Sequence, residues 1–308
     1  MSKEILIQAF TNMRGSDSWS LQLLKVNGGR EPVSYCARQI ELIPDGKIKS
    51  FAEVLVNKYL SADGIPAFSS VDNYTGDVVG KVIYKLDCGD ELIASAYNML
   101  VKQLGSPDTE GNIEAGKYQA YVLQTTIGKD GNKVPVRLVS MQSPVSLLSN
   151  RFILRIQRRS FKEITEPVLT LRRTMDVVIV GQTVYMLTLA GENLFAMERA
   201  YKAVCKEKVS DVIGCGFITN PERFKEVATF GQNPRRFVSY NQKRLDALRN
   251  INERKRLATK FGLALSGNSI DTNDEKTPER LVKFLCDKAM LDPLDDSPVE
   301  VSAAKSWK

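Results

Sequence analysis

Residues 118–141 have the sequence YQAYVLQTTIGKDGNKVPVRLVSM, and this stretch decides the fold class. Two runs with strand-like composition, 118–127 and 133–141, lie on either side of the glycine-containing loop 128–132. This pattern predicts a β-hairpin, because short polar loops that contain glycine connect neighbouring antiparallel strands. A sheet is therefore expected in the first half of the chain.

Working outward toward the N-terminus, three more segments have strand-like composition and are separated by turn-forming sequences. The strands expected there cover residues 3–8, 20–26 and 33–40. Two helices are expected between them and the hairpin, because apolar residues recur at helical spacing. The first follows Ser50 as N-cap and the second covers 90–104.

The second half of the chain is expected to contain a further β-hairpin and then mostly helices. Predicted strands cover 151–157, 168–172, 176–180, 184–189 and 299–307. Predicted helices lie near 194–204 and at 222–229, 239–261 and 278–291, with a break in the third near 250–252 and Thr277 as the cap of the last.

These patterns predict an α+β protein of two domains. A mixed sheet-and-helix unit is expected at residues 1–145, and a β-hairpin-containing, helix-rich C-terminal domain at 146–308. The length of 308 residues agrees with this division, since single domains usually have about 100 to 150 residues. The polar stretch at 142–144 is the expected boundary.

The composition excludes several kinds of chemistry. The chain has no histidine, so it cannot supply the histidine base of the common hydrolases, although a Ser–Lys pair remains open. Its five cysteines are scattered and form no CxxC pair, so we expect reduced thiols and no zinc site. We find neither a signal peptide nor an apolar run long enough for a membrane span, and we expect a cytoplasmic protein.

Residues 111–118 (GNIEAGKY) have the spacing of a phosphate loop up to the last position. There Tyr118 replaces the Ser or Thr that would hold Mg²⁺, and the segment leads toward a strand instead of a helix. We therefore interpret these residues as a connecting loop. No cofactor or metal is expected.

The positive charge of the chain is concentrated in two segments. Residues 151–175 carry a net charge of +5 and residues 235–260 carry +7, while the whole chain carries only +7. The rest of the chain is therefore negative, with a net charge of −5. Such an uneven distribution is typical of a surface that binds polyanions.

Both basic segments are candidate nucleic-acid contacts, although solvated faces remain an alternative. We find no base-reading motif, so binding is expected through phosphates and with little sequence preference. The candidate residues are Arg151, Arg155, Arg158, Arg159, Arg172, Arg173, Arg235, Arg236, Lys243, Arg244, Arg254, Lys255 and Arg256.

Two other functions stay open. A metal-dependent nuclease could use carboxylates and lysine without histidine, with Asp108, Glu114, Asp176 and Lys117 as candidates, but their spacing matches no known metal set. An interaction scaffold could use the basic surface to bind an acidic protein. A protein that binds and does not catalyse is the expectation that the residues favour.

The order of features in the second half resembles a known family. The segments 151–154 (RFIL), 161–164 (FKEI), 174–180 (TMDVVIV), 183–186 (TVYM) and 193–198 (NLFAME) are similar to the KwaB-like family, the B component of the Kiwa anti-phage defence system. The later segments 252–256 (NERKR) and 261–263 (FGL) continue this likeness, and 74–84 extends it more weakly. The resemblance covers residues 70–300.

This resemblance implies a cytoplasmic, dimeric protein that binds double-stranded DNA and blocks phage replication. It also implies a small integral-membrane partner, the A component, that recruits the protein to the inner membrane. The family pattern contains no catalytic signature that could be carried over to residues of this chain.

Overall fold

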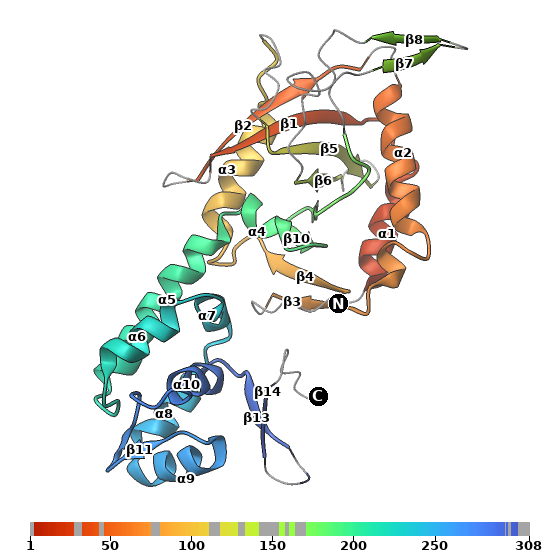
Figure 1. Ribbon diagram of the computed structural model, residues 1–308. Helices are drawn as coiled ribbons and strands as arrows, with labels where there is room; N and C mark the ends of the chain where they lie inside the picture. The colour runs from red at the N-terminus through yellow and green to blue at the C-terminus, as the bar shows by residue number, and fades with distance from the viewer. Residues whose placement is uncertain are drawn as a thin grey trace. The chain divides into compact units, whose positions relative to one another are not determined.

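The computed structural model describes residues 3–27, 33–42, 46–74, 81–110, 118–128, 133–141, 171–292, 294 and 297–300, and the strands alone at 154–157 and 160–163 (Figure 1). The chain forms two compact units. The N-terminal unit is drawn from residues 1–73 and 81–196, and the C-terminal unit mainly from 197–308. Helices and strands are both abundant, which confirms the α+β class.

An eight-stranded sheet organises the N-terminal unit. Neighbouring strands pair antiparallel, except β3 and β4, which run parallel. The predicted hairpin is confirmed, because β5 pairs with β6 from Tyr121 opposite Ser140 to Ile127 opposite Val134. Across the sheet the order is β2 (Ser34–Ile40), β1 (Ser20–Asn27), β5 (Ala120–Ile127), β6 (Val134–Ser140), β9 (Val177–Val180), β10 (Thr183–Met186), β4 (Val82–Asp87) and β3 (Ser70–Asn73).

Helices cover both faces of this sheet (Figure 1). Strand residues alternate between the two faces, so Leu21 and Leu23 enter the main core with α1 (Lys3–Met13) and α2 (Lys47–Leu60). Gln22 points the other way, and its amide donates to the Leu104 carbonyl of α3 (Ala94–Gly105) at 3.1 Å. The remaining short elements are η1 (Ile65–Ala67), α4 (Ala190–Leu194) and the separate pair β7 (Leu154–Gln157) and β8 (Ser160–Glu163).

Two strand predictions in this unit need correction. Residues 3–8 belong to helix α1, in which Leu6, Phe10 and Met13 are buried at helical spacing. The strand prediction relied on three apolar residues and stopped before the helical period became visible. The described end of the predicted strand 168–172, residues 171–172, is not in a strand, and its other residues lie outside the described part of the chain.

The division of the chain also differs from the predicted one. Strands β9 and β10 hydrogen-bond to β6 and β4, so the second hairpin completes the sheet of the N-terminal unit. The units divide between Ala196 and Met197 instead of after residue 145. Residues 142–144, the predicted boundary, lie outside the described residues. The boundary could not be predicted from the sequence because it depends on pairing between strands that lie far apart along the chain.

The C-terminal unit is mainly helical and has its own apolar core. Phe217, Phe224 and Phe237 are among its fully buried side chains. Its elements are α5 (Met197–Gly214), α6 (Pro221–Thr229), α7 (Asn233–Arg236), η2 (Phe237–Ser239), α8 (Gln242–Arg249), α9 (Ile251–Phe261), β11 (Leu265–Ser266), β12 (Ser269–Ile270), α10 (Thr277–Leu285), β13 (Ala289–Leu291) and β14 (Pro298–Glu300). All five cysteines of the chain are free, as predicted.

The predicted break within 239–261 is confirmed at Asn250. This residue ends α8 and is also the N-cap of α9, and its side chain accepts hydrogen bonds from the amides of Asn252 (2.9 Å) and Glu253 (3.1 Å). These bonds satisfy amides that the first turn of a helix leaves without partners. Gly262, with φ +61°, ends α9 in the left-handed conformation that glycine adopts readily.

The last predicted helix is shorter than expected and is capped differently. Thr277 is the first residue of α10 and Lys276 is its N-cap, so the prediction that Thr277 is the cap was wrong. The Asp274 carboxylate accepts the backbone amide of Thr277 at 2.8 Å. Helix α10 ends at Leu285, and Asp287 follows with a left-handed φ of 56°. The next residues form β13, which pairs with β14, while 301–307 of the predicted last strand lie outside the described residues.

Candidate nucleic-acid interface

The predicted phosphate contacts fall into three groups in the structure. Arg151, Arg158 and Arg159 lie outside the described residues, and of Arg155 only its place in β7 is described. A second group directs its guanidinium groups into the C-terminal unit. A third group, from both units, is exposed to solvent.

Arg172 and Arg173 are exposed on the N-terminal unit. Side chains from α2 and β5 hydrogen-bond to the backbone of this segment. Lys58 of α2 donates to the Arg173 carbonyl at 2.8 Å. The hydroxyl of Tyr121, on β5, is within hydrogen-bonding distance of the Arg172 and Thr174 carbonyls. The backbone is therefore fixed at two exposed arginines, which is the presentation that phosphate binding needs.

The tyrosine that holds this segment remains a proton donor at ordinary pH. Burial raises the pKa of Tyr121 to about 12, so its hydroxyl stays protonated. A second hydroxyl, that of Tyr59, accepts the Met175 amide at 2.6 Å and extends the anchoring by one residue. Sequence reasoning missed both contacts, because Tyr59 and Met175 are 116 residues apart.

Arg254 lies inside the C-terminal unit, with 7% of its surface exposed. Its guanidinium donates to the carbonyls of Leu248 (2.6 Å), Arg249 (3.1 Å) and Asn268. It also lies 4.9 Å from the centre of the Phe217 ring, at cation–π distance. We therefore remove Arg254 from the expected phosphate contacts, because its N–H groups already bond to backbone carbonyls at the end of α8 and in a neighbouring loop.

Arg244 has a similar internal role. It donates to the carbonyls of Phe284 (2.6 Å) and Ala289 (2.9 Å), and its Nε lies 2.7 Å from the Asp287 carboxylate. It also stacks on the Phe284 ring at 4.9 Å. These bonds connect α8 to the end of α10 and to β13. The guanidinium of Arg244 therefore stabilises the C-terminal unit and does not face a ligand.

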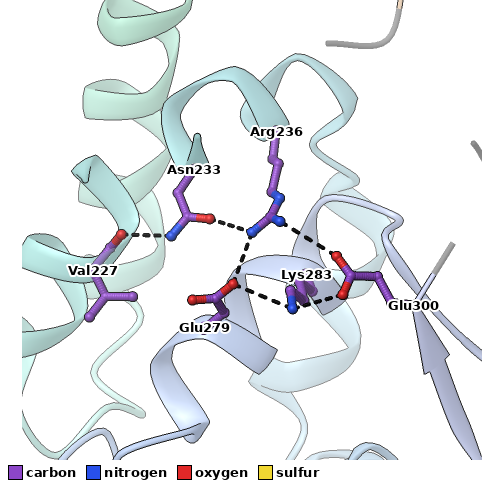
Figure 2. A network of polar contacts seen from close by, with 6 residues as sticks. All are labelled: Val227, Asn233, Arg236, Glu279, Lys283 and Glu300. Atoms are coloured by element: carbon purple, nitrogen blue, oxygen red, sulfur yellow. Dashed lines mark hydrogen bonds and ion pairs between the residues drawn. The ribbon is translucent and has the colours of Figure 1, made fainter. Parts of the chain in front are cut away.

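Arg236 takes part in an ion-pair network, and Arg235 is half-buried against an aromatic ring. Figure 2 shows Arg236 between Asn233, Glu279 and Glu300, with its nitrogens 3.2 Å and 3.5 Å from the two carboxylates. Arg235 lies 5.8 Å from the centre of the Tyr201 ring. Neither side chain is as open to a polyanion as the sequence predicted.

The predicted contacts that are exposed in the C-terminal unit lie on α8 and α9. Lys243, Lys255 and Arg256 are exposed, and the first two have no ion pair within the described residues. Arg256 lies 2.6 Å from Glu253 of its own helix, and both side chains are about half exposed. Exposed pairs of this kind contribute about 0.2 to 1 kcal/mol, so a phosphate can replace the carboxylate at little cost.

Arg249 joins this exposed group, although it was not among the predicted contacts. Its side chain is 55% exposed at the end of α8, 3.1 Å from Asp246 and 3.3 Å from the Cys215 sulfur. The sequence carried only the charge of segment 235–260 as a signal for it, because Arg249 is four residues after the buried Leu245 and lies at the edge of the buried face.

The described carboxylates considered for a nuclease have structural partners. Asp108 forms an ion pair with Arg38 at 2.7 Å, and Asp176 accepts the Met141 amide at 2.7 Å and the Thr188 hydroxyl at 2.6 Å. Glu114 and Lys117 lie outside the described residues, as do 111–117 of the phosphate-loop-like segment. Among the side chains that the structure describes, no three Cys, Asp or Glu residues gather as metal ligands.

The helices that carry these exposed cations lie within a region that matches a known family. The model of the family described as Kiwa protein KwaB-like matches residues 125–294, which is more than half of the chain. The chain belongs to this KwaB-like family. The match lies inside the range over which the sequence resembled it, whereas the weaker likeness at 74–84 lies outside it. No match is found among curated proteins or solved structures.

Membership of the KwaB-like family gives the protein a role in anti-phage defence. The exposed cations described above are compatible with several ways of serving that role. For the part of the chain that is described, no helix is both long and apolar enough to span a bilayer.

Proposed function

We propose that this KwaB-like protein binds double-stranded DNA through phosphate contacts and does not cleave it. The observation that carries the proposal is the group of exposed cations on α8 and α9, Lys243, Arg249, Lys255 and Arg256, within the region that matches the family. Cations on the outer faces of rigid helices can neutralise phosphates without reading bases. Arg172 and Arg173 are a second proposed contact, on the N-terminal unit.

The biological setting is part of the same proposal. The resemblance supports a cytoplasmic homodimer that works with a small integral-membrane partner, and through it at the inner membrane, to block phage replication. Binding without catalysis is supported by the lack of histidine and by the structural roles of Asp108 and Asp176. No cofactor is proposed.

Charge reversal on α8 and α9 tests the DNA contacts. The triple variant Lys243→Glu, Lys255→Glu and Arg256→Glu should weaken binding to all duplexes alike. It should also flatten the dependence of log affinity on log salt by about one unit for each lost contact. Fluorescence anisotropy with two unrelated duplexes at several salt concentrations measures both quantities.

A matched control separates a local contact from the net charge. Lys206→Glu, Lys225→Glu and Lys276→Glu reverse three exposed lysines of α5, α6 and the loop before α10 and change the net charge by the same amount. This variant should keep most of the wild-type affinity. If the two triple variants lose affinity equally, or if the wild type fails to bind at low salt, the cations are solvated faces and a scaffold function becomes the better proposal.

The absence of cleavage needs its own experiment. Purified protein with Mg²⁺ or Mn²⁺ should leave linear and circular DNA intact. Cleavage that disappears in Asp108→Asn or Asp176→Asn would show instead that the protein is a nuclease.

A further inference from the structure

A small basic pocket lies in the C-terminal unit between α10 and the β13–β14 hairpin. Its volume is about 160 Å³, and its lining includes Arg280, Lys283 and Lys288 but, among the residues that the structure describes, only one carboxylate, that of Glu300. The apolar residues Phe261 and Val299 complete much of the wall. At about 30 Å³ for each water molecule, the pocket has room for a phosphate group but not for a whole drug-sized ligand.

The three cations are held in place by the fold. Arg280 and Lys283 are three residues apart on α10 and therefore lie on one side of that helix. Arg280 donates to the Gly262 carbonyl at 2.6 Å, and Lys288 is buried, with 3% of its surface exposed. Three cations around one small pocket give it a positive electrostatic potential, so a site of this charge favours an anionic occupant.

The chain itself supplies an anion at this pocket. Figure 2 shows the Glu300 carboxylate bridging two cations, with one oxygen 2.9 Å from Lys283 Nζ and the other 3.5 Å from Arg236 Nη2. Glu279 also contacts both cations, at 3.2 Å from Arg236 and 3.4 Å from Lys283. Glu279 comes from α10, whereas Glu300 comes from a strand of only three residues.

The exposed fractions of the three side chains indicate that Glu300 is the group that an external anion can replace. The Glu300 side chain is 53% exposed, whereas those of Lys283 and Arg236 are 23% and 22% exposed. The cations are thus fixed and half-buried, and the acid approaches them from solvent. An anion that enters from solvent can replace Glu300 and leave the cations where they are.

We propose that this pocket is a phosphate-binding site that the chain's own Glu300 occupies as an internal competitor. Its ligand is a phosphate group, either as the free ion or as the terminal phosphate of a nucleic-acid strand. When it binds, the phosphate takes over the bond from Lys283 and gains contacts to Arg280 and Lys288. The site differs from the exposed cations of α8 and α9 and does not depend on them.

Calorimetric titration of the full-length protein with inorganic phosphate tests the site. Wild type should bind weakly, Glu300→Gln should bind about 10-fold more tightly because the competitor is gone, and Lys283→Gln should bind at least about 10-fold more weakly. Matched controls are Glu275→Gln and Lys276→Gln, which alter exposed residues outside the pocket lining. Both controls should behave as wild type.

Oligonucleotides distinguish the two sources of phosphate. A thymidine trinucleotide with a 5′-phosphate that competes with inorganic phosphate, when the unphosphorylated trinucleotide does not, identifies a strand end as ligand. Competition by neither identifies the free ion. If Glu300→Gln binds phosphate no more tightly than Glu275→Gln, the proposal is wrong. That comparison decides the matter even if Lys283→Gln fails to fold.

Discussion

Four described arginines, two from each basic segment of this chain, are placed in opposite ways. In the segment that begins at residue 151, side chains from elsewhere hold the backbone carbonyls of Arg172 and Arg173, and both residues are exposed. In the segment that begins at residue 235, Arg244 and Arg254 direct their own guanidinium groups at backbone carbonyls inside the unit. Similar charge density therefore does not mean similar function.

The difference teaches how an excess of arginine should be interpreted. Counting acids within a segment suggested that its arginines lacked partners. Glu279, Asp287 and Glu300, all outside the segment, supply ion pairs to Arg236 and Arg244, and Arg254 is satisfied by carbonyls alone. The cations that remain for DNA lie on the outer faces of the same helices.

The largest expected effect is on Arg254. Arg254→Met removes the donors for three carbonyls, and leaving buried polar groups without partners costs about 1 to 3 kcal/mol each. We expect the C-terminal unit to lose about 3 kcal/mol of stability. Arg254→Lys should recover little of this loss, because one ammonium group cannot reproduce the planar fork of a guanidinium.

Amide hydrogen exchange of α8 and α9, followed by mass spectrometry, measures that loss locally. Lys255→Met is the matched control, since it removes the neighbouring exposed cation and should change exchange by less than about 0.5 kcal/mol. Equal effects of the two substitutions would contradict the division into internal and external cations.

Arg244 should show the next largest effect. Arg244→Met leaves the carbonyls of Phe284 and Ala289 and the carboxylate of Asp287 without this partner, and we expect a loss of about 2 kcal/mol. Urea unfolding followed by circular dichroism is the measurement, with Lys243→Met as control. If DNA affinity falls while stability stays at the wild-type value, Arg244 is a phosphate contact after all.

A smaller effect is expected where the first basic segment is anchored. Tyr121→Phe removes the hydroxyl near the Arg172 and Thr174 carbonyls and should cost about 1 kcal/mol of stability. Arg172→Ala with Arg173→Ala should cost less stability than Tyr121→Phe but should weaken DNA binding. Thermal unfolding and anisotropy on both variants sharpen the comparison, and a large stability loss in the double alanine variant would contradict it.

The smallest predicted effect is a dependence on pH. Burial tends to raise the pKa of Glu279, but hydrogen bonds and charges from Arg236 and Lys283 outweigh it, so the pKa is lowered from its usual value of 4.5. A depressed pKa contributes stability above pH 4.5 that is lost as pH falls through the folded value. Because the side chain is 48% exposed, this contribution is a few tenths of a kcal/mol.

Unfolding in urea between about pH 6 and pH 3 measures this dependence. Glu279→Gln should flatten the acid limb of the profile slightly, whereas the control Glu222→Gln on α6 should not. A profile for Glu279→Gln that falls as steeply as that of wild type would show that the network adds no pH-dependent stability.

Local patterns predicted much of the secondary structure. The β5–β6 hairpin and the break at Asn250 follow from strand-like composition, turn chemistry and helical period, all of which act within a few residues. The strand predicted at 3–8 failed because the window was too short to show the burial of Phe10 and Met13. The domain boundary failed because β9 and β10 pair with strands that lie far away in sequence.

The candidate site was predictable only in part. The amphipathic pattern of α8 and α9 places Lys243 and Lys255 outside, and the exposed faces could be inferred from it. The inward direction of Arg244 depends on carbonyls 40 and 45 residues away, and that of Arg254 on a loop 14 residues away. No periodicity records such contacts, so sequence reasoning assigned internal arginines to the surface.

Asn250 has a consequence for how this region can change during evolution. Since one residue ends α8 and starts α9, the corner has no spare loop to absorb an added residue. Each residue turns a helix by about 100°, so a single insertion within α9 ahead of Lys255 would rotate the later buried side chains, Ala258 and Phe261, away from the core. Substitutions can therefore accumulate on the outer faces of α8 and α9, whereas insertions and deletions between Lys243 and Lys255 should be rejected.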